Sequence, residues 1–75
     1  MLNNFKINFR GMEVIPTLEH TSMYDTLDYD IGRLHVSIAY DNLLYQTIYN
    51  KKDYEERVKY IALEKLEALC NEAYM

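Results

Sequence analysis

Apolar and polar residues alternate along two segments of the chain, which is the pattern of a β-strand with one buried face. In the first segment Phe5, Ile7 and Phe9 alternate with polar residues. Gly11 interrupts the alternation, and an isolated glycine in a strand pattern indicates a bulge or a bend. We therefore predict one bent strand over about residues 4–15.

The second alternating segment predicts a strand over about residues 33–41. Asp41 and Asn42 stand at its end, and because both residue types tolerate a positive φ they favour a two-residue turn. A third strand over about residues 43–49 then returns along the second. This hairpin would pair Tyr40 with Leu43, Ile38 with Tyr45, Val36 with Thr47 and Leu34 with Tyr49, and all of these pairs would share one face.

Residues 17–31 carry mixed signals. Their Thr, Met, Tyr and Ile residues favour extended structure, whereas Asp25, Asp28 and Asp30 weaken it. We interpret the segment as a loop that leads into an irregular strand over residues 23–31. A loop throughout and a fourth strand both stay open as alternatives.

The last third of the chain predicts a helix over about residues 53–74. Neither Gly nor Pro occurs after Asp53, and strong helix formers dominate. Asp53 with Glu56 forms a capping-box pattern, and Asn50 is the alternative N-cap. The predicted fold is α+β: a small antiparallel sheet of three or four strands with one C-terminal helix on one face, in a single domain of residues 1–75.

The predicted helix has more apolar surface than one sheet needs. Its apolar residues span roughly 200° or more, whereas a surface helix needs a stripe of about 100°. One stripe suits the sheet and consists of Tyr54, Val58, Ile61, Ala62, Leu69 and Ala73, with Leu66 at its edge. We call the second group the helix lobe: Tyr60, Leu63, Cys70 and Tyr74. Either the sheet or the 16–31 segment wraps the helix lobe, or the lobe is exposed and binds a partner.

Composition limits the class of protein. The chain has 75 residues, a net charge of −4 and 49% hydrophobic residues, which is typical of one small globular domain. A domain of this size has a thin core, so we expect it to associate with a second copy or with a partner. One cysteine allows no internal disulfide, and without a signal-peptide pattern it favours the cytoplasm. No stretch approaches the roughly 18 apolar residues of a membrane span.

Acidic residues and tyrosines gather in one segment. Between Met12 and Ile31 there are five acidic residues and no Lys or Arg. Tyrosine, of which the chain has eight, combines a large apolar ring with a polar tip and is frequent at interfaces. We define the acidic patch as Glu19, Tyr24, Asp25, Asp28, Tyr29 and Asp30. The acidic patch is either a solvated loop or a surface complementary to a basic partner.

Few residues suit metal binding or catalysis. His20, His35 and Cys70 lack the paired spacing of a zinc site, so we predict no metal and no cofactor. His20, Ser22 and Asp25 lie close in the sequence, but nothing beside them would form an oxyanion hole. Two glycines are too few for a phosphate-binding loop. We therefore predict that the protein is not an enzyme.

These features predict a small acidic, tyrosine-rich protein-binding module. It would be a viral or mobile-element inhibitor or accessory protein that blocks a surface on a larger macromolecule. One alternative is a structural homo-oligomer, for example a homodimer that buries the helix lobe. The other is a nucleic-acid-binding regulator, although acidic residues lie among its basic ones. Those basic residues are Lys51, Lys52, Arg57 and Lys59.

Overall fold

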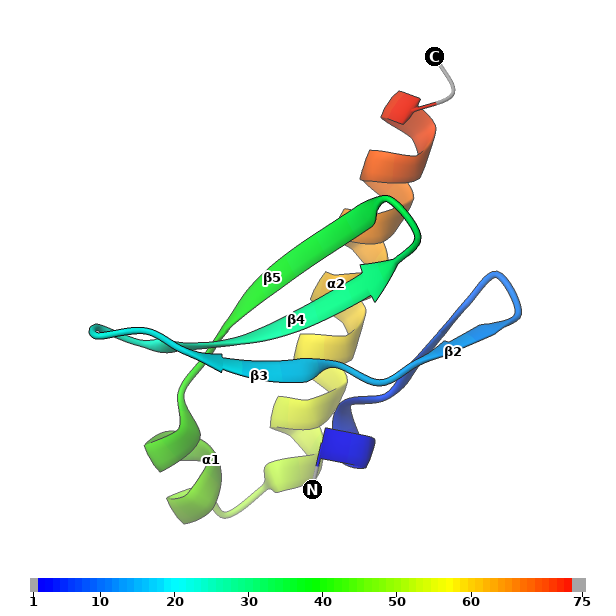
Figure 1. Ribbon diagram of the computed structural model, residues 1–75. Coiled ribbons are helices and arrows are strands. Elements are labelled where there is room, and N and C mark those ends of the chain that lie inside the picture. Colours follow the sequence, from blue (N-terminus) through cyan, green and yellow to red (C-terminus); the bar gives the residue numbers. More distant parts are fainter. Residues whose placement is uncertain (1, 74–75) are drawn as a thin grey trace.

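The computed structural model describes residues 2–73, and over this range the chain forms two antiparallel sheets and a long C-terminal helix (Figure 1). One sheet has two strands and the other has three, which lie in the order of the sequence. The predicted α+β class is confirmed. After a turn of 3-10 helix (Leu2–Phe5), the elements are β1 (Ile7–Phe9), β2 (Met12–Val14), β3 (Thr17–His20), β4 (Asp25–Ile31), β5 (Leu34–Tyr40), α1 (Asn42–Thr47) and α2 (Lys51–Ala73).

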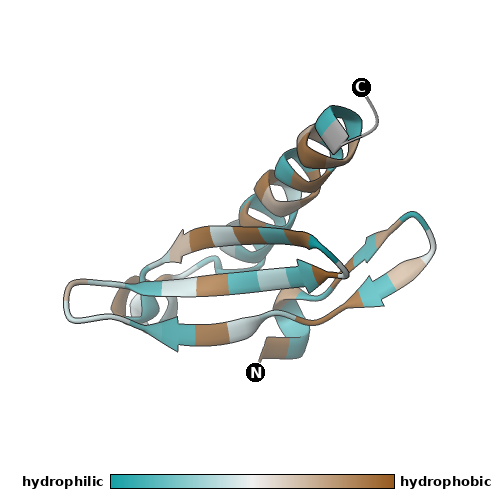
Figure 2. Cartoon of the chain, turned by 45° about the horizontal axis from the view of Figure 1, so that its top comes forward, coloured by the Kyte–Doolittle hydropathy of each residue, from teal (hydrophilic) through white to brown (hydrophobic). Residues whose placement is uncertain are grey.

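Helix α2 crosses one face of the three-stranded sheet and packs against β5. Figure 2 shows α2 passing behind the sheet, along whose strands hydrophobic and hydrophilic residues alternate. In the register of β4 and β5, Leu27 lies opposite Ile38, and both side chains are buried in the core. Because residues four apart form one row along a helix, a narrow row of α2 supplies the core. That row is Val58, Ala62, Leu66 and Cys70.

The first predicted strand is in fact a hairpin. The chain reverses at Arg10 and Gly11, where φ is 52° and 86°, so β2 returns along β1 and pairs Ile7 with Val14. Two consecutive positive φ values are the requirement of a type I′ hairpin turn. The backbone N–H of Gly11 donates to the Asn8 side-chain oxygen at 3.0 Å, which holds the turn. Gly11 therefore marks a reversal of the chain, and the predicted bulge or bend at this position is wrong.

Residues 17–31, whose sequence is compatible with both a loop and a strand, form the hairpin of β3 and β4. Strand β3 is exposed along its whole length, and β4 lies at the centre of the sheet. The turn between them occupies residues 21–24. The three aspartates of β4 are tolerated because Asp25 and Asp30 lie near the ends of the strand and Asp28 finds hydrogen-bond partners on the outer face.

The predicted strand over residues 43–49 is wrong, since this segment contains helix α1. Asp41 is the N-cap of the helix, and its carboxylate accepts from the backbone N–H of Leu44 at 2.9 Å. Asp is favoured both in turns and at helix N-caps, so the residue type did not distinguish the two. The helix brings Tyr45 into the core, where it packs against three other aromatic rings.

Helix α2 begins at Lys51, earlier than the predicted start at residue 53. Asn50, the alternative N-cap, accepts from the backbone N–H of Asp53 at 3.3 Å and donates to the Asp53 carboxylate at 2.8 Å. Asp53 therefore takes the third helical position, where it bonds to the side chain of Asn50, and is not the cap itself.

An ion pair joins the β1–β2 turn to the C-terminal half of α2. The Arg10 guanidinium donates to both carboxylate oxygens of Glu67, at 2.7 and 3.2 Å, and to the Cys70 sulfur at 3.0 Å. The guanidinium also lies 5.3 Å from the centre of the Phe9 ring. Because the hydrogen bond from Arg10 favours the charged carboxylate, it lowers the pKa of Glu67 below its ordinary value.

We expect Glu67→Gln to destabilise the fold at neutral pH and to have little effect in acid. A carboxyl group whose pKa is lowered by folding stabilises the fold above its unfolded-state pKa, and this contribution is lost as the pH falls through its folded-state pKa. Urea unfolding of wild type and Glu67→Gln at pH 7 and about pH 3 measures the difference. In an Arg10→Ala background the substitution should have no effect at either pH. An equal loss at both pH values would contradict this role of the ion pair.

Candidate functional site

Thr21 organises the turn between β3 and β4. Its backbone N–H and its hydroxyl both donate to the carbonyl oxygen of Tyr24, at 3.0 and 2.6 Å. The same hydroxyl oxygen accepts from the backbone N–H of Tyr24 at 3.1 Å. These bonds hold the turn that carries Met23 and Tyr24. Binding of a partner to these side chains would therefore cost little conformational entropy in the backbone of the turn.

Four aromatic rings form a cluster where the N-terminal segment, β5, α1 and α2 meet. They belong to Phe5, Tyr40, Tyr45 and Tyr54, and the distances between their centroids run from 5.2 to 6.5 Å. Their tilted and edge-to-face arrangements are the favourable ones for aromatic pairs. The cluster fixes α1 against the rest of the fold and accounts for three of the tyrosines.

Tyrosine hydroxyls of the cluster tie down the start of α1. The Tyr54 hydroxyl accepts from the backbone N–H of Asp41 at 3.0 Å, and the Tyr40 hydroxyl donates to the side-chain oxygen of Asn42 at 3.3 Å. Burial raises the pKa of Tyr40 to about 12. Its phenol therefore stays protonated and keeps its hydrogen bond over the physiological range.

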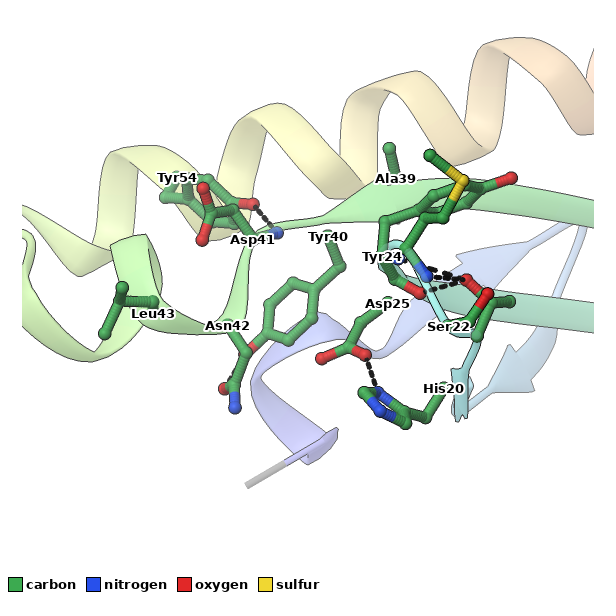
Figure 3. A pocket seen from close by; sticks show the side chains of 12 residues that line it. His20, Ser22, Tyr24, Asp25, Ala39, Tyr40, Asp41, Asn42, Leu43 and Tyr54 are labelled. Carbon is green, nitrogen blue, oxygen red and sulfur yellow. Dashed lines mark hydrogen bonds and ion pairs between the residues drawn. The ribbon is translucent and has the colours of Figure 1, made fainter.

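A groove of about 630 Å³ lies between the β3–β4 turn and the start of α1 (Figure 3). Three of its lining residues expose large apolar side chains: Met23 is 86% exposed, Leu43 75% and Tyr24 59%. Tyr40 and Tyr54, from the aromatic cluster, also line it. We call it the tip groove, lined by residues 20–25, residues 39–43 and Tyr54.

The charges of the tip groove are acidic. Asp25 and Asp41 line it, and neither Lys nor Arg does. The imidazole Nδ1 of His20 pairs with the carboxylate of Asp25, as the dashed line in Figure 3 shows. Apolar side chains beside carboxylates suit a ligand that carries an apolar group next to a cation.

The structure divides the predicted acidic patch, because successive residues of a strand point to opposite faces. Tyr24 and Asp25 line the tip groove. Tyr29 lies in the core instead, where its hydroxyl donates to the carbonyl oxygen of Phe5 at 2.7 Å. Asp28 is also buried, on the outer side of the sheet. The expectation that Tyr29 and Asp28 face a partner is therefore wrong.

The remaining acidic residues belong to a network on the outer face of the sheet. The Ser37 hydroxyl donates to the Asp28 carboxylate at 2.7 Å. The His35 ring contacts Asp30 through Nδ1 and the Ser37 oxygen through Nε2, the latter at 3.1 Å. Hydrogen bonding between the carboxyl groups of Glu19 and Asp28 raises the pKa of Glu19 and lowers that of Asp28.

This network has the residue types of a Ser-His-Asp triad but not its chemistry. A catalytic histidine accepts the serine proton at Nε2. Here the Ser37 hydroxyl hydrogen points to Asp28, so Nε2 of His35 acts as a donor to Ser37. The hydrogen bond with Asp30 raises the pKa of His35, which favours the doubly protonated ring. The arrangement therefore favours a charged imidazole.

The helix lobe is not one exposed surface. Tyr60 is 62% exposed and its hydroxyl donates to Glu64 at 3.1 Å, whereas Leu63 is half-buried and packs against the core. The expectation that Cys70 is part of an exposed lobe is wrong: Cys70 is buried, because it belongs to the row of every fourth residue that faces the sheet. Tyr74 lies outside the described residues.

Other kinds of site have little support in the part of the chain that the structure describes. No group of three or more potential metal ligands lies together within residues 2–73, and no helix there is long and apolar enough to cross a membrane. Of the basic residues near the start of α2, Lys51 lies over the Tyr45 ring and Lys59 pairs with Glu56. Comparisons with models of protein families, with curated proteins and with solved structures give no match.

Proposed function

We propose that the protein is a non-catalytic protein-binding module that takes up a segment of its partner in the tip groove. The observation that carries this proposal is the clustering of Met23, Tyr24 and Leu43, all strongly exposed, around one groove. Exposed apolar side chains are normal when they are scattered, but several around one concave surface are typical of an interaction site. By covering part of a larger macromolecule, such a module would act as an inhibitor or accessory protein.

The rigidity of the groove supports this proposal. Hydrogen bonds of Thr21 fix one wall, and the aromatic cluster with the capping carboxylate of Asp41 fixes the other. A preformed site loses less conformational entropy on binding than a flexible one and so binds more tightly for the same contacts.

The chemistry of the groove indicates the kind of segment it takes. An apolar side chain would be buried among Met23, Leu43 and the aromatic rings. A neighbouring Lys or Arg would meet Asp25 and Asp41, and the net charge of −4 would speed the approach of a basic partner. We further propose that the protein acts in the cytoplasm, which is supported by its single cysteine, a buried thiol.

Selection of peptides from a random library displayed on phage tests this proposal. We expect the immobilised protein to enrich peptides with an apolar residue next to Lys or Arg. Replacing Met23 and Leu43 together by alanine should raise the Kd of these peptides about tenfold or more, because two apolar contacts are truncated. Fluorescence anisotropy with labelled peptides measures the change.

Tyr49→Ala is the matched control. Tyr49 is exposed, as Met23 and Leu43 are, but it does not line the groove, so its replacement should leave the Kd within about twofold. If no peptide is enriched, or if the enriched peptides bind the double alanine variant as tightly as wild type, the tip groove is not the binding site.

A further inference from the structure

Strand β5 forms an edge of the three-stranded sheet that is not protected against pairing. Within residues 2–73 it pairs with β4 on one side and with no strand on the other. Its seven residues, Leu34 to Tyr40, include no proline, no glycine and no lysine, the residues that usually prevent edge strands from pairing. A long regular edge of this kind is a template for a further strand.

One face of α2 lies beside this edge. A second hollow, of about 340 Å³, runs between the edge of β5 and the helix. On the helix side it is lined by Lys65, Ala68, Leu69 and Glu72, whose spacing of three or four residues puts them on one face. We call these four residues, together with His35, Val36 and Ser37 on β5, the edge face.

We propose that the edge face binds a second copy of this chain, with β5 antiparallel to the partner's β5 and α2 antiparallel to the partner's α2. A two-fold dimer requires a surface that is complementary to itself. On α2, Lys65 and Glu72 lie at equal distances in sequence from the pair Ala68 and Leu69. Antiparallel packing about that pair would place each lysine opposite the glutamate of the other copy, and small or apolar residues between them.

The strand is self-complementary as well. Its central residue is Ser37, and an antiparallel copy centred there would place His35 opposite Ala39, so that no like charges meet across the new pairing. The other edge of the sheet is less suitable, since β3 has only four residues and carries Glu19. A dimer through β5 would join two three-stranded sheets into one of six strands.

This dimer does not depend on the tip groove. The groove lies at the end of β5 that Tyr40 marks, and in an antiparallel pair the two grooves would lie at opposite ends of the joined strands. A dimer would therefore present two grooves and bind a partner that offers two segments more tightly than one groove binds one.

Sedimentation equilibrium over a range of protein concentrations tests this proposal. We expect wild type to dimerise, and we expect Lys65→Glu and Glu72→Lys each to raise the dimer Kd about tenfold or more, because each brings like charges together at two symmetric places. The double variant, with both charges exchanged, should return the Kd to near that of wild type. Lys52→Glu, a charge reversal outside the edge face, is the control and should leave the Kd unchanged.

Hydrogen exchange supplies a second readout, for the strand pairing. As the concentration rises through the dimer Kd, exchange of backbone amides in β5 should slow, since those that point away from β4 would then donate to the partner strand. Circular dichroism verifies that each variant is folded. A wild-type protein that stays monomeric up to about 1 mM, or a dimer whose Kd the single charge reversals leave unchanged, would overturn the proposal.

Discussion

Replacing Phe5 with alanine is expected to lower the free energy of unfolding by about 3–5 kcal/mol. Phe5 is fully buried and is in ring contact with Tyr40, Tyr45 and Tyr54, so its removal leaves a cavity at the centre of the aromatic cluster. For a domain of 75 residues, with a total stability of roughly 4–11 kcal/mol, this is a large part of the whole.

Tyr49→Ala is the control for this loss, because it removes an aromatic ring that is fully exposed. We expect its free energy of unfolding to stay within about 0.5 kcal/mol of wild type. Urea unfolding followed by circular dichroism measures both variants, and the slope of the transition should be unchanged. If Phe5→Ala costs no more than Tyr49→Ala, the cluster does not hold α1 in place.

The second large effect is expected for Leu66→Ala, at about 2–5 kcal/mol. Leu66 is fully buried in the row of α2 that faces the sheet. The surrounding Val58, Ala62 and Cys70 lie on a rigid helix and are expected to close only part of the cavity. The loss combines the transfer free energy of the removed methyl groups with the cost of the remaining cavity.

Leu43→Ala is the same substitution on an exposed helical position, and we expect it to change the free energy of unfolding by about 0.5 kcal/mol or less. The comparison of the two leucines in urea therefore isolates the contribution of burial. Similar losses at Leu66 and Leu43 would mean that the row of every fourth residue is not the buried side of α2.

The fold class followed from patterns that report burial directly. Val36, Ile38 and Tyr40 alternate with polar residues, and this alternation correctly predicted β5 and its inward face. The long C-terminal run of helix formers correctly predicted α2. Its buried side was harder to predict, because apolar residues occur around much of the helix, and only the crossing of α2 over the sheet selects the row that contains Leu66 and Cys70.

The segment 41–49 shows where local signals failed. Its residues Leu43, Tyr45 and Tyr49 would share one face of a hairpin strand. The free energy is lower as a short helix, because Tyr45 then reaches Phe5, a residue 40 positions earlier in the chain. Asp41 suits a turn and an N-cap equally. A contact between residues so far apart in sequence decides the structure, and a local pattern does not contain it.

The candidate site was only partly accessible to sequence reasoning. Tyr24 and Asp25 belong to the predicted acidic patch and line the tip groove, whereas the predicted third strand contains Leu43 and no sequence pattern marks Met23. The groove is formed by the β3–β4 turn, the end of β5, the start of α1 and Tyr54 of α2, which are far apart in the sequence. Thr21 is the residue that could have indicated Met23. Threonine hydroxyls favour short turns by bonding to nearby backbone, and the Thr21 hydroxyl does so in the turn that carries Met23.

The most direct test of the tip groove is to map the binding of the tightest selected peptide by two-dimensional NMR of the isotope-labelled protein. We expect the largest chemical-shift changes at residues 20–25 and 39–43, with small changes on the outer face of the sheet around His35 and Ser37. The Met23→Ala, Leu43→Ala double variant should lose these changes at the same peptide concentration. Changes centred on the outer face of the sheet or on Tyr60 of α2 instead would show that the protein binds its partner elsewhere.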